Sequence, residues 1–190
     1  MPIILITGGA RSGKSHLAQE FARRSGKSVL FVATAVAGDE EMRQRIKEHQ
    51  KSRPATWRTL EVATHAGKEI VQNSGGAQLI IVDCITLLVN NVFSRFTGET
   101  GENIDASLLE KEVTAEITEL IDCFDRVRAD FIIVTNEVGL GLVPANNIGR
   151  LYRDLLGRAN QLLAARADEV YLMVSGLPLK LKGKPGIILL

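Results

Sequence analysis

Several features are scarce in this sequence of 190 residues. Its two cysteines are too few for a disulfide framework, so we expect a reducing, cytoplasmic setting. The net charge is only +1 and aromatic residues make up 5%, which argues against a protein that binds nucleic acid or an anionic membrane over its whole surface. No apolar run approaches the roughly 18 residues of a membrane span, and no basic-then-apolar leader opens the chain. We therefore expect neither a nucleic-acid partner nor membrane insertion.

The residues that are present are typical of one globular domain. Hydrophobic residues make up 45% of the chain and charged residues 24%, close to the average for folded proteins. The length is enough for one domain with a full hydrophobic core and too short for two. We expect a single domain over residues 1–190, and the sequence leaves open the structure of the tail, residues 180–190.

Short apolar runs alternate with helical patterns along the chain. The runs are apolar on both faces, as the strands of a buried parallel sheet are. They are Ile3–Ile6, Val29–Ala33, Leu79–Val82, Phe131–Thr135 and Val170–Val174. Apolar residues at helical spacing fill the intervals between them, most clearly over residues 108–124 and 148–163. This alternation predicts an α/β fold with a mostly parallel sheet flanked by helices.

A phosphate-binding motif follows the first predicted strand. The pattern G-x-x-x-x-G-K-[ST] is matched by Gly8, Gly9, Ala10, Arg11, Ser12, Gly13, Lys14 and Ser15. Its glycines let successive backbone N–H groups point at phosphate oxygens, and the following helix adds its positive end. Lys14 would reach the β- and γ-phosphates, and the hydroxyl of Ser15 would bind Mg²⁺. The alternative is a glycine-rich turn between strand and helix that binds no ligand.

Asp83 directly follows the apolar run Leu79–Val82. A P-loop enzyme needs an acidic residue at the end of a neighbouring strand to hold the magnesium shell, and Asp83 fits that requirement. The alternative is a structural role, in which Asp83 caps the helix that follows at Ile85.

A basic segment surrounds one of the three histidines. Residues 42–58 hold six basic residues and one acidic residue, and His49 lies among them. Nearby cations disfavour the protonated imidazole, which would leave His49 neutral and able to attack a phosphorus centre. The alternative is a solvated helix face, which is what a charge run ordinarily forms. His16 and His65 have no neighbours in the sequence that predict a role.

Together these segments resemble one family, the bifunctional adenosylcobinamide kinases / adenosylcobinamide-phosphate guanylyltransferases of cobalamin biosynthesis. The P-loop alone is shared by very many NTPases, and its combination with H-x-x-x-R-P and T-N-E-V-G is much more specific. The likeness runs to about Lys182. The segments that carry it are the P-loop, His49–Pro54 with Trp57 and Glu61, Asp83–Thr86, Thr135–Gly139 with Val143 and Pro144, Gly157–Gln161, and Asp168–Val170.

The resemblance implies two consecutive reactions. ATP or GTP would first phosphorylate the aminopropanol hydroxyl of adenosylcobinamide. GTP would then transfer GMP to that phosphate through a GMP–histidine intermediate on His49, with release of pyrophosphate. The resemblance also implies a RecA-like P-loop sheet and assembly as a homotrimer.

The resemblance assigns site residues as well. Lys14 and His49 would be catalytic, and Ser15 and Asp83 would bind Mg²⁺. Nucleotide contacts would fall on the P-loop, residues 8–15, and on Ala33, Thr34, Ala35, Gln50, Lys51, Ser52, Arg53, Glu61 and Asp83. Asn136 and Glu137 follow a predicted strand, at the edge where α/β sheets place ligands, although a polar loop with a capping Asn is the alternative.

Other classes of function stay open at this point. A P-loop kinase of another small metabolite would carry His49 merely on a helix surface. A RecA-like ATPase that acts on nucleic acid would need a basic stripe with stacking aromatics. A nucleotide-binding module without activity would turn over no phosphate acceptor.

Overall fold

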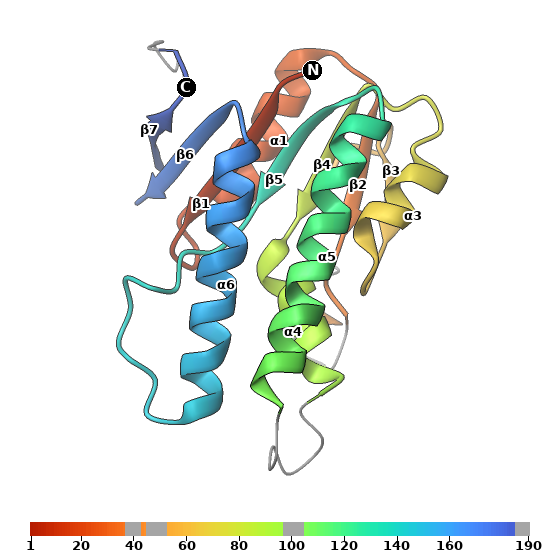
Figure 1. Cartoon of the computed structure of the whole chain (residues 1–190). Coiled ribbons are helices and arrows are strands. Elements are labelled where there is room, and N and C mark those ends of the chain that lie inside the picture. The colour runs from red at the N-terminus through yellow and green to blue at the C-terminus, as the bar shows by residue number, and fades with distance from the viewer. Residues whose placement is uncertain (37–42, 45–52, 97–104, 185–190) are drawn as a thin grey trace.

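A seven-stranded sheet forms the centre of the computed structural model, which describes residues 1–36, 43–44, 53–96 and 105–184 (Figure 1). The strand order is β3-β2-β4-β5-β1-β6-β7. All neighbouring strands are parallel except β6 and β7, which pair antiparallel. The predicted α/β fold with a mostly parallel sheet is therefore confirmed.

The five strands predicted from apolar runs all form. They are β1 (Ile3–Gly8), β2 (Val29–Ala33), β4 (Leu79–Asp83), β5 (Asp130–Val134) and β6 (Glu169–Val174). Two further strands were not predicted, β3 (Arg58–Glu61) and β7 (Leu177–Lys182). Both lie at the edges of the sheet and are largely exposed, so their sequences lack the apolar character of a strand buried on both faces.

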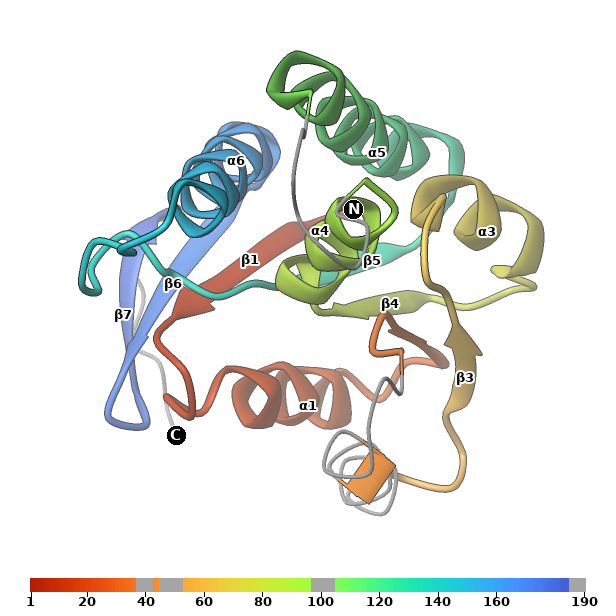
Figure 2. The ribbon, with the colours of Figure 1, turned by 90° about the horizontal axis from the view of Figure 1, so that it is seen from below.

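Helices cover both faces of the sheet (Figure 2). One face carries α3 (Ala66–Asn73), α4 (Ile85–Ser94), α5 (Ala106–Arg126) and α6 (Asn147–Arg166), and α1 (Lys14–Ser25) packs on the other. The side chains of Asp105 and Asn146 accept backbone N–H groups in the first turns of α5 and α6. Such caps satisfy donors that a helix start leaves unpaired.

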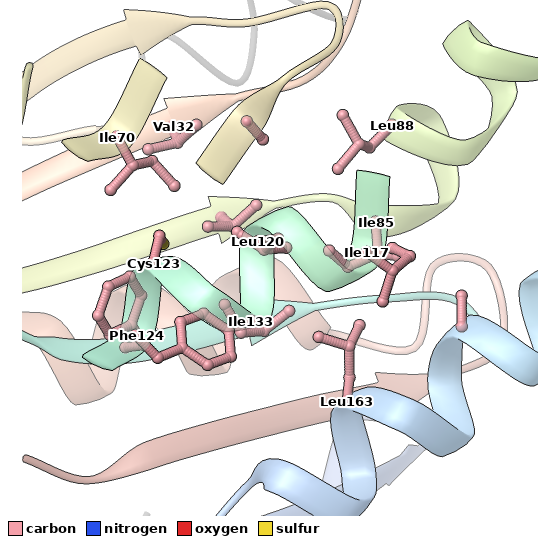
Figure 3. Packing of buried hydrophobic residues seen from close by; sticks show 14 of the residues in the cluster. Val32, Ile70, Ile85, Leu88, Ile117, Leu120, Cys123, Phe124, Ile133 and Leu163 are labelled. Carbon is pink, nitrogen blue, oxygen red and sulfur yellow. The ribbon is translucent and has the colours of Figure 1, made fainter. Parts of the chain in front are cut away.

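The larger apolar core lies between the sheet and α3 to α6 (Figure 3). Ile117 and Leu120 of α5 are fully buried there, and the rings of Phe124 and Phe131 lie 4.7 Å apart. Each fully buried side chain of this size contributes about 1.5–3 kcal/mol to stability. This packing holds α5 and α6 against the strands whose ends carry the candidate site residues.

Two carboxylates of α5 fix the start of α3. Glu116 is buried and accepts the backbone N–H groups of His65 (2.7 Å) and Ala66 (2.8 Å). Glu119 accepts from the N–H of Lys68 and lies 3.4 Å from Nδ1 of His65. The sequence predicted no neighbour for His65, because the partners are some 50 residues away along the chain. The contact is structural and pins α3 to α5.

The topology brings three strand ends to one edge of the sheet. β5 lies between β1, which leads into the P-loop, and β4, which ends at Asp83. This order, with one strand between the P-loop strand and the strand of the acidic residue, is that of a RecA-like P-loop sheet. Because the three strands are parallel, their carboxyl ends meet at the lower edge in Figure 1, which faces the viewer in Figure 2. Ligands bind at such edges in α/β sheets.

The described part of the tail belongs to the sheet. β7 pairs with β6, and Nζ of Lys182 donates to the carbonyls of Ala164 and Ala165 near the end of α6. Residues 185–190 lie outside the described residues. Within the described ranges, no helix combines the length and the apolar character needed to cross a bilayer.

Candidate active site

The P-loop, Gly8–Ser15, connects β1 to α1 and adopts conformations that need glycine. Gly13 stands at the N-cap of α1 with φ +96°, in the left-handed region. Gly8 has φ +147°, and a Cβ there would lie only 2.5 Å from the carbonyl oxygen of Met173. The predicted sequence of strand, loop and helix is thus present. The loop leaves the start of α1 without a side-chain cap, as an anion-binding helix N-terminus would.

Lys14 is buried at the start of α1, with 7% of its surface exposed. Its ammonium donates to the carbonyl oxygen of Gly9 at 2.6 Å. Burial lowers the pKa of Lys14, and the nearby groups Cys84 and Asp83 oppose that shift. Lys14 therefore lies close to the end of β4, as a P-loop lysine and its acidic partner should.

The ends of β2 and β4 are joined through Thr34. Its hydroxyl donates to the carbonyl of Cys84 (2.7 Å) and accepts the N–H of Cys84 (2.8 Å), and Thr34 is fully buried. Nδ2 of Asn91 donates to the carbonyl of Thr34. Thr34 was predicted as a nucleotide contact, yet its hydroxyl is already used to shape the turn after Asp83. The adjacent Ala35 is half-buried.

Arg53 lies near the two predicted acidic residues, Asp83 and Glu61. Its guanidinium stacks on the ring of Phe31, 3.8 Å from the ring centroid. Burial lowers the pKa of Arg53, and the charges of Asp83 and Glu61 oppose that shift. Nε and Nη1 of Arg53 are buried and have no hydrogen-bond partner in the described part of the chain. Unpaired buried donors of a cation are costly, and an anionic ligand would satisfy them.

The structure brings together most of the residues predicted for the site. The P-loop, Ala33, Thr34, Ala35, Glu61 and Asp83 lie at the carboxyl edge of β1, β2, β3 and β4, and Arg53 is near enough to Glu61 and Asp83 to interact with their charges. Ala33 pairs with Glu61 on one side and with Asp83 on the other. His49, Gln50, Lys51 and Ser52 lie outside the described residues.

One contact to the P-loop was not foreseen. The turn between β6 and β7 contains Ser175 (φ +53°) and Gly176 (φ +84°), and the N–H of Gly176 donates to the carbonyl of Ser12 at 3.1 Å. A Cβ on Gly13 would lie 3.4 Å from the Cα of Gly176. The signal available in the sequence was the Ser-Gly pair between two short strands, which is typical of a hairpin turn. This turn therefore packs against the P-loop and holds the backbone of Ser12 in place.

The sequence as a whole matches a family of known enzymes. Residues 4–181 match the family model described as cobinamide kinase / cobinamide phosphate guanyltransferase. The chain belongs to this family. Members are enzymes with both activities, so the chain is a cobinamide kinase and cobinamide phosphate guanyltransferase. A P-loop with a buried lysine and an acidic strand end is an arrangement that P-loop enzymes use in phosphoryl transfer.

Curated relatives are similar to this chain over nearly its whole length. The chain is 43% identical to the bifunctional adenosylcobalamin biosynthesis protein CobU of Salmonella typhimurium over 181 residues, which cover 95% of this chain and 99% of that protein. It is 40% identical to the bifunctional adenosylcobalamin biosynthesis protein CobP of Pseudomonas aeruginosa, with 95% and 98% covered. Among solved structures, the RadB recombinase gives a TM-score of 0.49 at 15% identity, covering 90% of this chain and 73% of that one.

The oxygen donors of the site fit magnesium. Mg²⁺ is usually held by one or two carboxylates together with substrate phosphates, rather than by a complete cage of protein ligands. Asp83 ends β4 beside the P-loop, and Ser15 stands in the first turn of α1. Across the described residues, no three His, Cys, Asp or Glu side chains gather into a metal-binding group. The donor set therefore suits a metal whose remaining ligands come from the nucleotide.

The turn at Gly176 allows a matched test of how the P-loop is supported. Gly176 (φ +84°) and Gly76 (φ +77°) both have open space where a Cβ would be added, but Gly76 lies at the amino end of β4. Alanine should cost about 1–2 kcal/mol of stability at either position because of the left-handed backbone. We expect similar losses of melting temperature in both variants, and a rise of several-fold in the KM for nucleotide only in Gly176→Ala. Equal nucleotide KM values would show that the turn does not support the P-loop.

Proposed function

We propose that the chain phosphorylates the aminopropanol hydroxyl of adenosylcobinamide with ATP or GTP, and then transfers GMP from GTP to the new phosphate through His49. The observation that carries this proposal is the pair of cationic side chains near the end of β4. One is Lys14, buried in the P-loop, and the other is Arg53, whose Nε and Nη1 are buried without a hydrogen-bond partner in the described part of the chain. A kinase reaction needs the first, and a second displacement at phosphorus would use the second.

In the phosphoryl transfer, the P-loop would bind the triphosphate of the donor. Lys14 would exchange the carbonyl of Gly9 for oxygens of the β- and γ-phosphates, where negative charge is concentrated during transfer. The hydroxyl of Ser12 is buried without a partner among the described residues, and it would donate to a phosphate oxygen. Bound Mg²⁺, held by Ser15 and Asp83, would neutralise further charge on the phosphates. The hydroxyl oxygen of the acceptor then attacks the γ-phosphorus, loses its proton, and displaces the nucleoside diphosphate.

In the guanylyl transfer, a neutral imidazole of His49 would attack the α-phosphorus of GTP. The bond to the β-phosphate oxygen breaks and pyrophosphate leaves. An oxygen of adenosylcobinamide phosphate then attacks the same phosphorus and displaces the histidine nitrogen. Arg53 follows His49 by four positions in the sequence, so their Cα atoms are at most about 14 Å apart. Arg53, with its two unpaired donors, would hold the phosphates during both displacements.

A direct assay of the two products tests this proposal. Purified protein with Mg²⁺, adenosylcobinamide and ATP should yield adenosylcobinamide phosphate, and further addition of GTP should yield adenosylcobinamide-GDP and pyrophosphate. Formation of the phosphate without the second product would leave a kinase only. Formation of neither product would contradict the proposed substrate.

Asp83→Asn separates the catalytic role of this residue from a structural one. The amide keeps the size of the side chain and its ability to cap, but it is a much weaker ligand for Mg²⁺ than a carboxylate. We expect both reactions to slow by about 100-fold, with the melting temperature within a few degrees of wild type. Turnover should be measured across a magnesium titration, with the folded fraction of each sample determined. Loss of stability with unchanged activity per folded molecule would assign Asp83 a capping role instead.

We further propose that the protein assembles as a homotrimer. Three leucines of β7, an edge strand of the sheet, are largely exposed: Leu177, Leu179 and Leu181. An exposed apolar edge strand tends to be covered in an assembly. Light scattering should give a molar mass of about three times the 20.7 kDa of the chain. A mass equal to that of one chain would contradict the proposal.

A further inference from the structure

The backbone at the end of β5 is held by hydrogen bonds from several other elements. The N–H of Thr135 donates to the carbonyl of Ile6 in β1, and the N–H of Glu137 donates to the carbonyl of Gly8 in the P-loop, both at 3.0 Å. Between them, the N–H of Asn136 donates to the hydroxyl of Thr86 at the start of α4 (2.8 Å). This segment is therefore tied to the P-loop strand and to the helix that follows Asp83.

Asn160 of α6 completes this arrangement. Its amide oxygen accepts the hydroxyl of Thr135 (2.7 Å), and its amide nitrogen donates to the carbonyl of Asn136 (3.0 Å). The neighbouring positions of α6 that face the core, Leu156, Ala159 and Leu163, are buried and apolar. A half-buried amide on such a face contributes less to packing than leucine would, so the contribution of Asn160 lies in its two hydrogen bonds.

Asn136 lies at the carboxyl edge of the sheet, between the P-loop strand and the strand that ends at Asp83. The register pairs Val134 with Ile6 on one side and with Asp83 on the other, so Asn136 follows at the edge between the P-loop and Asp83. Both backbone polar groups of Asn136 are bonded, whereas its carboxamide makes no hydrogen bond to any residue in the described ranges. The backbone of Asn136 is therefore fixed in place and its amide is free to donate to a ligand, and donors held near the reacting group stabilise charge that develops in a transition state.

We propose that the carboxamide of Asn136 is a catalytic group that donates to the γ-phosphoryl oxygens in the kinase reaction, and that Asn160 is its positioning residue. This inference rests on the proposed kinase function. The carboxamide of Asn136 would donate a hydrogen bond to the transferring group itself. Asn160 would act indirectly, because its hydrogen bond to the carbonyl of Asn136 fixes the position of that backbone next to the P-loop. Neither residue is needed for the attack of His49 on the α-phosphorus, so the guanylyl transfer should depend on them much less.

The test compares single and double variants in the kinase reaction with ATP and adenosylcobinamide. Asn136→Ala should lower kcat by about 100-fold, the usual loss of one donor to a transition-state oxygen, with the KM for ATP within about threefold of wild type. Asn160→Asp keeps the acceptor for Thr135 but places a carboxylate oxygen against the carbonyl of Asn136. It should lower kcat by about tenfold. If Asn160 acts through Asn136, the double variant should be no slower than Asn136→Ala alone.

Matched variants separate this role from a loss of folding. Thr135→Val removes the other hydrogen bond of the Asn160 amide and leaves Asn136 held, so kcat should fall by less than about threefold at a comparable loss of melting temperature. Thr86→Val removes the hydrogen bond from the N–H of Asn136, so it loosens the same backbone at a different point. It should lower kcat about as much as Asn160→Asp does. This second variant tests the role of the Asn136 backbone even if Asn160→Asp folds poorly. Guanylyl transfer to preformed adenosylcobinamide phosphate should change by less than about threefold in every variant.

The outcomes are distinguishable. A wild-type protein that fails to phosphorylate adenosylcobinamide would refute the proposed function itself. A working wild type with an unimpaired Asn136→Ala variant would overturn the role of Asn136. Multiplicative effects in the double variant would show that Asn160 acts independently of Asn136. A loss of guanylyl transfer equal to the loss of kinase activity would show a general structural effect. Either result would overturn the positioning role.

Discussion

Lys14→Ala should abolish both reactions, with each rate falling by about 1,000-fold or more. Its ammonium is the buried cation of the P-loop, and it donates a hydrogen bond to the carbonyl oxygen of Gly9. Phosphate oxygens of a bound nucleotide can replace that carbonyl as the acceptor. Arg53 is stacked on Phe31, so its guanidinium is held away from the position that the Lys14 ammonium takes at Gly9. Loss of the main cation at the β- and γ-phosphates removes the charge stabilisation on which phosphoryl transfer depends.

The fold should survive this change. Removal of a buried charge also removes its desolvation cost, so the melting temperature should stay close to that of the wild type. Lys68→Ala, which truncates an exposed lysine on α3, serves as the control and should keep full activity. Kinase turnover in Lys14→Ala within tenfold of wild type would remove the P-loop lysine from the mechanism.

His49→Asn should separate the two activities. Asparagine keeps a polar side chain of similar reach but offers no adequate nucleophile for the α-phosphorus of GTP. The variant should form no covalent GMP adduct and no adenosylcobinamide-GDP, a loss beyond about 10⁴-fold, and should still phosphorylate adenosylcobinamide at a measurable rate. Mass spectrometry of the protein after incubation with GTP detects the adduct directly. In the wild type, adduct formation should fall at acidic pH, since a protonated imidazole has no free electron pair for attack.

His65→Asn is the matched control for this variant. His65 is exposed at the start of α3 with φ +57°, a conformation that asparagine tolerates, so this substitution should leave the adduct unchanged. A phosphorus–nitrogen bond should be labile in acid and stable in base. An adduct mapped to another residue, or one that persists in His49→Asn, would contradict the assignment.

The sequence predicted the central strands of the fold better than the edge strands, for a physical reason. A strand that is buried on both faces has a continuous apolar sequence, and all five strands predicted from such runs form in the structure. β3 and β7 pair through backbone groups at the edges of the sheet, and backbone hydrogen bonds impose little on side chains. The tail from Leu177 to Lys182 is an example, because it alternates leucine with lysine or proline and leaves the leucines exposed.

The candidate site was predictable wherever its residues are contiguous in the sequence. The P-loop needs eight consecutive residues, and Asp83 needs only a strand before it. Asn160 and Gly176 were not predicted as site residues, because Asn160 contacts Thr135 and Asn136 across about 25 positions and Gly176 contacts Ser12 across most of the chain. Thr34 was predicted by resemblance, but its hydroxyl bonds to Cys84, a use that only the folded geometry reveals.

The central claim is that one small domain carries out both transfers, with the α-phosphorus of GTP passing through the protein. Incubation with GTP labelled at either the α- or the γ-phosphate, with and without adenosylcobinamide, tests it most directly. The α-label should become bound to the protein in the absence of adenosylcobinamide and move into adenosylcobinamide-GDP when adenosylcobinamide and a phosphate donor are added, while the γ-label should never be bound to the protein. A protein-bound γ-label, or formation of adenosylcobinamide-GDP without a protein-bound α-label, would contradict the account.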